Sequence, residues 1–505
     1  MSDTLVITGI IAAYLAVTLW VGLRGGRQSS ASVTGYVAGD RQFGLLVMYF
    51  VTGATIFSAF AFLGGPGWAY SRGAAAFYIL SYAVLGIAPW YALGPRAARV
   101  GRRMGFVTQA QLLVGRFPSR ELSALVALLS VIAFIPYITL QMRGAGIVIE
   151  AVTGGLVPLW AGAAVAYGIV LIYVLVGGVA AVGWTNTLQG IFMLTLAWIL
   201  GIYLPWSLHG GVEPMFREIL AERPELLAVP GLTGGGEPWS WGAYSSAILV
   251  SAVGLCMWPH LFMKAFTAKD ERTIRRTVVL MPTFTLFLIP VFLIGFAGVM
   301  VVEGLDQPDF ILPHLILSAE LPILLVGLFC AGALSASMST GDALLHATAS
   351  VAVEDGIRPY RPLSEAAQRA LMRVLVVVSG AVAYLFALDE DQSLVVLLLS
   401  SYGIIAQLAP PIVAALYWRR ATTAGAVAGL VAGSVVTLFF FLRPELSPWG
   451  IHEGVLGLAV HLPVLVGVSL ATRPQPVEHA HRFVAEAAGA RTGTEGDTPS
   501  TRPES

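Results

Sequence analysis

Small polar side chains and one carboxylate occur together in an otherwise apolar stretch around residue 340. Residues 332–342 have the sequence GALSASMSTGD. Sodium is a hard cation that takes oxygen ligands, and hydroxyl groups together with backbone carbonyls supply such oxygens without burying a large charge. Ser339 and Thr340 point about 100° apart on a helix, so both can bind one ion only if it lies near the face between them. Helix packing through small residues also explains the segment, and taken alone it explains it better.

Two ionisable residues, Asp342 and Arg143, stand inside long apolar stretches. A charge at the centre of a bilayer costs at least ~2.5 kcal/mol, so such a residue is expected to be partnered or functional. The planar guanidinium of Arg143 suits a carboxylate, and one hypothesis is that it holds the carboxylate of an anionic substrate. An internal ion pair of Arg143 with Asp342 or Glu150 is an equal alternative. His260, close to Trp258, either lines a cavity or is a buried core histidine.

The composition places these residues in a membrane protein. The chain has 505 residues, of which 57% are hydrophobic and 11% charged, and its mean hydropathy is +0.79. Soluble proteins carry about 25% charged residues. Equal numbers of basic and acidic residues, 29 of each, exclude a nucleic-acid-binding protein. Cys256 and Cys330 both lie in apolar runs and provide neither a disulfide framework nor a cysteine-rich metal site.

Long apolar runs predict an all-α polytopic membrane protein. A helix needs about 20 residues to cross a ~30 Å hydrocarbon core, and about 13 transmembrane helices are expected on this basis. The runs are 5–23, 44–68, 74–93, 122–151, 158–176, 184–206, 244–265, 278–302, 321–352, 374–388, 393–418, 425–442 and 451–472. The first follows Asp3 rather than a basic segment and is expected to be an uncleaved span.

Basic residues divide unevenly between the two sets of loops that these spans define. One set holds most of the 29 Lys and Arg residues, whereas the other holds only Arg72, Arg217, Arg223 and Arg443. The positive-inside rule therefore predicts a protein of the cell (plasma or inner) membrane with its N-terminus outside and its C-terminus in the cytoplasm. Residues 473–505 are rich in Arg, Glu, Gly, Thr and Pro and are expected to form a disordered cytoplasmic tail.

Helix breakers occur at matching places in two consecutive blocks of five runs. Gly53 and then the sequence GGPG at 64–67 interrupt the second run, and Gly254 and then Trp258 followed by Pro259 interrupt the seventh. Glycine and proline are common in membrane helices, but paired breakers in two halves indicate an inverted-repeat transporter with a site near the membrane midplane. The predicted organisation is an extra N-terminal helix and link in 1–30, a first repeat in 31–210, an extracellular loop in 211–240, a second repeat in 241–443 and an extra C-terminal helix in 444–472.

Four motifs in order resemble the sodium:solute symporter family over about residues 30–470. They are GYVAGDR at 35–41, SAF at 58–60 followed by GGPGWAY at 64–70, GGVAAVGWT at 177–185, and MSTGD at 338–342. The resemblance implies a five-plus-five inverted repeat of the leucine-transporter type and solute uptake driven by a sodium gradient. It also implies that sodium binds between the second and ninth runs, through the carbonyls of Ala54, Phe57 and Ala336 and the hydroxyls of Ser339 and Thr340.

The substrate site implied by the resemblance lies beside the same helix breaks. Its candidates are Phe60, Ala61, Trp258 and His260, together with Arg143. The chain departs from the family at Asn186, where many members carry an aspartate associated with sodium coupling or a second sodium ion. An amide keeps an oxygen ligand but loses the charge, so a second sodium ion is in doubt unless Asp342 compensates.

These observations predict a secondary transporter in the lipid bilayer that imports a small organic solute, favoured to be a carboxylate, together with sodium by alternating access. Alternatives on the same fold are proton coupling and a neutral solute such as an amino acid or a sugar. A transporter-like sensor would need a signalling domain, which the polar residues after Thr472 are too few to form. Nothing in the sequence predicts an enzyme or a cofactor other than the coupling ion, and the oligomeric state is left open.

Overall fold

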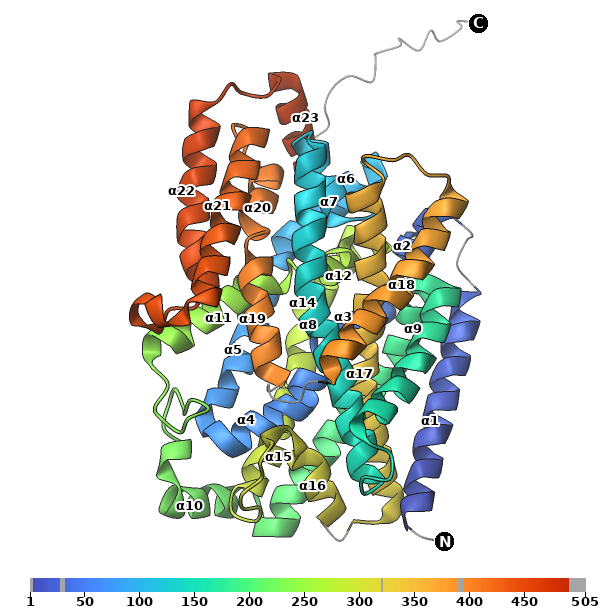
Figure 1. Ribbon diagram of the computed structural model, residues 1–505, viewed down its shortest axis with the longest axis vertical. Coiled ribbons are helices and arrows are strands. Elements are labelled where there is room, and N and C mark those ends of the chain that lie inside the picture. Colours follow the sequence, from blue (N-terminus) through green and yellow to red (C-terminus); the bar gives the residue numbers. More distant parts are fainter. Residues whose placement is uncertain (1–2, 28–31, 319–320, 389–393, 490–505) are drawn as a thin grey trace, which may run out of the picture.

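The computed structural model describes residues 3–27, 32–318, 321–388 and 394–489. Within these ranges the chain is helical and without strands, apart from two isolated bridges that join Phe43 to Ala268 and Leu232 to Pro238. The predicted all-α class is therefore confirmed. The first helix begins at one end of the molecule, and the last helix lies at the other (Figure 1).

A succession of helices makes up the described part of the chain. The first half contains α1 (Asp3–Gly26), α2 (Val33–Ala38), α3 (Leu45–Ile56), the π-helical turn η2 (Phe60–Gly64), α4 (Gly65–Arg72), α5 (Phe77–Ile87), α6 (Trp90–Met104), α7 (Gln109–Arg116), α8 (Arg120–Val152) and α9 (Leu159–His209). The second half contains α10 (Val212–Glu222), α11 (Trp241–Leu255), α12 (Pro259–Phe262), α13 (Lys264–Thr267), α14 (Glu271–Thr285), α15 (Leu288–Gly298), η5 (Pro308–Phe310), α16 (Ile311–Ser318), α17 (Ile323–Val351), η6 (Ala352–Ile357), α18 (Glu365–Ala387), α19 (Leu394–Ala406), α20 (Ala409–Tyr417), α21 (Thr423–Leu442), α22 (Glu453–Ala471) and α23 (Val477–Ala488).

α17 lies in the middle of the molecule, whereas α1 and the pair α21 and α22 lie on opposite flanks (Figure 1). In the most apolar part of α17 and its extension, 78% of the residues are buried, against 28% in α1 and in α22. A helix that is apolar all round and buried belongs to the core, whereas an apolar helix with most of its surface exposed needs a lipid environment. The small polar residues of α17 are therefore deep inside the protein.

Nine of the described helices are long and apolar enough to cross a membrane, and the number of spans rises to eleven if each of two bent pairs forms one. The runs predicted at 158–176 and 184–206 form the single element α9, which consists of two helical segments joined at Gly178. This residue has φ 53° and ψ −144°. A Cβ there would lie 2.6 Å from the carbonyl oxygen of Tyr36, so the turn requires glycine.

The first interrupted span is present, but its break lies before the residues at 64–67. α3 ends just before Phe57, which has φ −98° and ψ 90°, and the segment Phe60–Ile87 is bent by 56° from α3. The glycines at 64–67 are helical instead, and they allow close packing. A Cβ on Gly67 would lie 2.9 Å from the carbonyl oxygen of Pro308. The predicted interruption of this span is thus confirmed and follows Gly53, whereas the prediction that the residues at 64–67 break the helix was wrong.

The second interrupted span breaks where the sequence indicates. α11 ends at Leu255, and Pro259 occupies the first turn of α12, as expected for a residue without a backbone N–H. The two parts are bent by 45°. At each break, backbone N–H and C=O groups lack partners from their own helix. The protein interior therefore contains two places where backbone hydrogen-bonding groups are available to other partners.

The C-terminal segment is more ordered than predicted. Within the expected disordered tail, 473–505, the residues Val477–Ala488 form the amphipathic helix α23, which buries Phe483 and Ala487 against α6 and α20. The helical spacing of its apolar residues was hidden in a composition that is polar on average. Residues 490–505 of the predicted tail lie outside the described residues.

Arg116, one of the basic residues of the loops, is fully buried at the end of α7. Its Nη2 donates to the carbonyls of Trp418 (3.3 Å), Arg419 (3.0 Å) and Ala421 (3.2 Å), and its Nη1 donates to Gln475. The cation thus caps carbonyls just beyond the C-terminus of α20. Burial lowers the pKa of the Arg116 guanidinium from its usual 12.5 to about 10, which leaves it charged at neutral pH.

Replacing Arg116 by methionine is expected to destabilise the purified protein by about 2–4 kcal/mol, because several buried carbonyls lose their donors at once. Thermal unfolding in detergent measures this as a lower midpoint temperature. Arg120→Met is the matched control, since Arg120 is exposed at the start of the next helix. An equal midpoint for both variants would contradict a capping role for Arg116.

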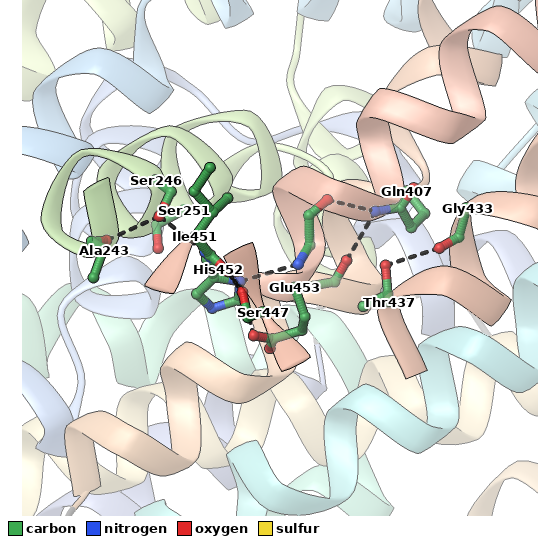
Figure 2. A network of polar contacts seen from close by, with 12 residues as sticks. Ala243, Ser246, Ser251, Gln407, Gly433, Thr437, Ser447, Ile451, His452 and Glu453 are labelled. Carbon is green, nitrogen blue, oxygen red and sulfur yellow. Dashed lines mark hydrogen bonds and ion pairs between the residues drawn. The ribbon is translucent and has the colours of Figure 1, made fainter. Parts of the chain in front are cut away.

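A polar network attaches α21 and α22 to the rest of the protein (Figure 2). The backbone N–H of His452 donates to Ser246 Oγ on α11 at 2.9 Å. Gln407, between α19 and α20, donates through Nε2 to the carbonyls of Gly403 (3.2 Å) and Gly454 (3.0 Å). These bonds fix α11 and α19 relative to each other through the N-terminus of α22.

Candidate functional site

The end of α3 and the middle of α17 bring hydroxyl and carbonyl oxygens together. Because α3 stops here, the carbonyls of its last turn lack donors from their own helix. Ser339 Oγ donates to the carbonyl of Ala54 (2.9 Å), and Thr340 Oγ1 donates to the carbonyls of Ala54 (3.3 Å) and Thr55 (3.1 Å). Ser339 Oγ also lies 3.2 Å from the carbonyl of Ala336. Four of the predicted sodium ligands are thus linked to one another.

Phe57, the remaining predicted ligand, is the residue at which α3 ends. Its N–H donates to the carbonyl of Gly53 at 2.9 Å, and its extended ψ turns its own carbonyl out of the helical direction. The ring stacks on Phe284, with centroids 5.8 Å apart, and meets Phe287 edge-on at 5.0 Å. Because the side chain is used in packing, only the backbone of Phe57 is available to an ion.

The oxygens of this cluster suit a monovalent cation. They are neutral carbonyl and hydroxyl oxygens, whereas protein sites for Ca²⁺ and Mg²⁺ use carboxylates. Across the described residues, no group of three or more His, Cys, Asp and Glu side chains could hold a metal ion. A single positive charge held by neutral oxygens fits the interior of a membrane protein better than a doubly charged ion does.

Asn186 joins this oxygen cluster from α9. Its Nδ2 donates to the carbonyl of Ser339 (2.7 Å) and to Thr55 Oγ1 (3.2 Å). Its Oδ1 is buried and has no hydrogen-bond partner among the residues that the structure describes. Asn186 therefore holds α17 and α3 together and keeps one free acceptor. Thr55 was not singled out from the sequence, because an isolated threonine in an apolar run carries no signal of its own.

Asp342 lies two residues after Thr340 and is fully buried. Its Oδ2 accepts hydrogen bonds from Tyr173 Oη (2.8 Å) and Thr185 Oγ1 (3.1 Å), both on α9. The structure shows no ion pair between Arg143 and Asp342, whose Oδ2 is bonded to hydroxyl groups and whose Oδ1 has no hydrogen-bond partner among the described residues. Tyr173 and Thr185 lie far from Asp342 in the sequence, so only the fold brings them to it.

Arg143, on α8, is 2% exposed. A Cβ on the next residue, Gly144, would lie 2.5 Å from the Cβ of Ala59, so α8 packs closely against the segment after the first break. The guanidinium acts through space on Asp309 in η5. Burial raises the pKa of the Asp309 carboxyl, and the Leu394 N–H (2.9 Å) and the charge of Arg143 oppose that rise.

The predicted substrate residues lie at the two helix breaks, within a cluster of aromatic rings. Trp258 lies 5.8 Å from His260 and 4.8 Å from Tyr137 of α8, measured between ring centroids. Phe60 stacks on Tyr82 of α5 at 6.5 Å. Tyr402 of α19 connects the two groups, since its ring lies 5.5 Å from Tyr82 and 5.6 Å from Trp258. Ala61 is buried in η2, and its N–H donates to the carbonyl of Ser58 at 2.9 Å.

Sequence reasoning missed Tyr82, Tyr137 and Tyr402 as members of this aromatic cluster. One signal was present: tyrosine and tryptophan are enriched at the membrane interfaces, so tyrosines inside long apolar runs are unusual. The three residues belong to three different helices, and no spacing along the chain connects them. Only the packing of α5, α8 and α19 around the second break places the rings together.

Comparison with known proteins identifies the family. The model of the sodium:solute symporter family matches residues 36–433 of the 505. The chain belongs to the sodium:solute symporter family. An uncharacterized symporter of Bacillus subtilis, YhjB, is 29% identical over 92% of this chain and 96% of its own length. The sodium/pantothenate symporter of Escherichia coli is 28% identical over 84% of this chain and 88% of its own.

A solved structure of a Na⁺-coupled sialic acid symporter, in a substrate-bound outward-open state, superposes on this symporter with a TM-score of 0.77. The two share 18% identity, and the match covers 93% of this chain and 98% of the other. At this identity the likeness shows the fold, which is the predicted inverted repeat of the leucine-transporter type. The symporter is thus a multi-pass membrane transporter and not an enzyme, as the sequence predicts.

Proposed function

We propose that this symporter couples the inward movement of sodium to the import of a small organic carboxylate. The observation that carries the proposal is the cluster of neutral oxygens formed by Ala54, Ser339 and Thr340 at the end of α3. An ion bound there holds the broken helix against α17. Sodium binding and the position of α3, which borders the aromatic cluster, are therefore coupled.

The carboxylate is supported by the charge that the protein offers. Arg143 is a buried guanidinium on a helix that lines the aromatic cluster, and guanidinium groups suit carboxylates. Among the relatives with a named solute, the pantothenate symporter, a monocarboxylate permease and the sialic acid symporter are named for organic acids, whereas others are named for proline. A neutral solute, such as an amino acid or a sugar, is the second candidate, and proton coupling is the alternative to sodium.

The charge distribution supports an N-terminus outside the cell and a C-terminus in the cytoplasm. Sodium that enters the cell moves down the membrane potential. Each ion contributes about 2.3 kcal/mol per 100 mV, enough for about 50-fold accumulation of a neutral solute. One sodium ion moving with a monovalent anion carries no net charge, so the transport of a carboxylate then uses the chemical gradient alone.

Uptake into vesicles that contain the purified protein tests the proposal. We expect an inward sodium gradient to drive accumulation of at least one labelled carboxylate from a panel, because the ion and the solute enter together. Replacement of sodium by potassium should abolish it. Undiminished uptake without sodium would refute sodium coupling, and uptake driven by a pH gradient would favour the proton alternative. Accumulation of neutral solutes only would refute the carboxylate.

A further inference from the structure

We propose that the solute of this symporter is a planar ring acid with additional oxygen acceptors, recognised by Trp258, Tyr82 and His260. The inference rests on the proposed function, because it names the class of carboxylate for the same site. These three side chains belong to the aromatic cluster around the two helix breaks, and their polar atoms lack partners.

Trp258 Nε1, Tyr82 Oη and both ring nitrogens of His260 are buried and make no hydrogen bond of normal geometry in the described parts of the chain. The three residues are 1%, 0% and 3% exposed. The hydroxyl of Tyr402 nevertheless lies near enough to interact with Trp258 and Tyr82. More than about 90% of buried polar groups in proteins are paired with protein groups or ordered water, and polar groups at membrane depth otherwise line a cavity. Three unpaired side chains in one cluster therefore mark a place where a ligand supplies the partners.

The neighbouring tyrosine provides the contrast. Tyr78 lies one helical turn before Tyr82, with ring centroids 5.0 Å apart, and is equally buried. Its hydroxyl is paired with Ser251 Oγ of α11 at 3.0 Å. Burial of a tyrosine at this place in α5 thus does not in itself prevent pairing. The ring of Tyr82 instead meets that of Tyr402 of α19, with centroids 5.5 Å apart, and its hydroxyl makes no hydrogen bond of normal geometry among the described residues.

Ring faces dominate the same region. The ring of Trp258 contacts those of Phe134, Tyr137, His260 and Tyr402 at centroid distances of 4.8 to 5.9 Å. Aromatic faces pack best against other flat groups, in stacked or edge-to-face arrangements. A planar ring can therefore insert among them by small shifts of neighbouring rings, whereas a saturated ring of the same size is thicker and displaces them further.

The unpaired atoms define the hydrogen bonds that the solute must make. An indole N–H only donates, a phenol hydroxyl donates or accepts, and a neutral imidazole offers one donor and one acceptor. Donors therefore predominate, and the solute must present acceptor oxygens. The rings of the cluster carry no charge that could hold a carboxylate. Two buried cations lie on elements that border it, Arg143 on α8 and Lys264, which acts through space on His260, and the planar guanidinium of Arg143 suits a carboxylate better.

Two of the helices that border the cluster, α11 and α19, are connected to each other by hydrogen bonds. Ser246 and Ser251 of α11 lie on the same side of the network in Figure 2, which continues through His452 to Gln407 at the end of α19. α11 leads directly into the break with Trp258, and α19 carries Tyr402. The donors are thus preorganised for one ligand shape, which lowers the entropy lost on binding.

Thermal stabilisation of the purified full chain by ligands, in saturating sodium, tests the ring class. We expect benzoate to stabilise the protein at a concentration at least tenfold lower than cyclohexanecarboxylate, its saturated counterpart. We expect 4-nitrobenzoate, which adds two acceptor oxygens, to act at about three- to tenfold lower concentration than 4-methylbenzoate, the range that one hydrogen bond provides.

Three variants test the donors. Trp258→Phe and Tyr82→Phe each remove one unpaired donor and keep a ring, so each should reduce the preference for 4-nitrobenzoate over 4-methylbenzoate about three- to tenfold. Tyr78→Phe removes a hydroxyl that is already paired and should leave this preference unchanged. The preference is the ratio of the concentrations at which the two ligands stabilise the same variant. A loss of stability caused by the substitution affects both concentrations and cancels in the ratio.

Two results would overturn the inference: stabilisation by cyclohexanecarboxylate equal to or stronger than that by benzoate, or no stabilisation by either. Equal effects of Tyr78→Phe and Tyr82→Phe would exclude Tyr82 as a ligand-binding donor. Sodium-driven uptake of aliphatic acids alone would reject the planar ring and leave the proposed function intact. Stabilisation by ring acids whose uptake does not depend on sodium would refute the proposed sodium coupling and leave the planar ring intact.

Discussion

Replacing Ser339 and Thr340 together by alanine is expected to raise the sodium concentration for half-maximal transport about 10- to 100-fold. The change removes both side-chain oxygens of the cluster and leaves only backbone ligands, and a loss of about 1 kcal/mol for each hydroxyl gives an effect of this size. The maximal rate at saturating sodium should change much less. Uptake of a labelled substrate at a series of sodium concentrations measures both quantities.

Ser335→Ala is the matched control for this prediction. Ser335 lies on the same helix, about one turn before Ser339, and is equally buried. Its hydroxyl donates to the carbonyl of Ala331 (2.8 Å) and to Tyr14 Oη (2.8 Å), away from the end of α3. The Ser335→Ala variant shows how much the loss of any one hydroxyl from α17 changes the sodium concentration for half-maximal transport. If Ser335→Ala shifted the sodium dependence as much as the double variant does, the assignment of the ion site would be wrong.

Replacing Arg143 by glutamine is expected to weaken the binding of an anionic substrate about 100-fold, while its neutral amide analogue changes less than about threefold. A hydrogen-bonded pair between buried charges is worth about 2–5 kcal/mol when one partner is removed, and a neutral ligand does not make that pair. The KM values for an acid and for its amide, measured with the same protein, give the ratio.

The competing explanation is that Arg143 serves only to hold the loop that carries Asp309. Asp309→Asn then provides the decisive comparison, because it removes the carboxylate on which the guanidinium acts and keeps the side-chain shape. A structural role predicts that both variants lose acid and amide transport to the same extent and unfold at lower temperature. Substrate binding by Arg143 predicts selective loss of the acid in Arg143→Gln alone.

Much of the oxygen cluster proposed as the ion site was predictable because its members come from short segments. Ser339 and Thr340 are adjacent in α17, and Ala54 and Phe57 lie within one turn, so two local motifs define the set once the family resemblance pairs them. The position of the first break was not predictable from glycine content. Gly67 serves close packing against Pro308, whereas the chain leaves the helix at Phe57, whose ring stacks on Phe284.

The partners of the buried charges were not predictable at all. Asp342 and Arg143 are both isolated charges in apolar runs, and pairing them was a reasonable alternative. In the structure Asp342 is bonded to Tyr173 and Thr185, whereas Arg143 acts on Asp309. A sequence shows that a buried charge needs a partner, but the choice among distant candidates depends on how the helices pack.

By itself the sequence determined that the protein is an all-helical membrane transporter, since hydropathy and breaker positions act along the chain within one or two turns. It also determined the oxygen-rich character of α17. Only the tertiary structure decided which groups meet where no motif pairs them: Asp342 with Tyr173 and Thr185, and the rings of Trp258, Tyr82 and Tyr402 in one aromatic cluster. The physical reason is that hydrogen bonds and ring contacts act over a few ångströms, so contacts between distant helices exist only after packing.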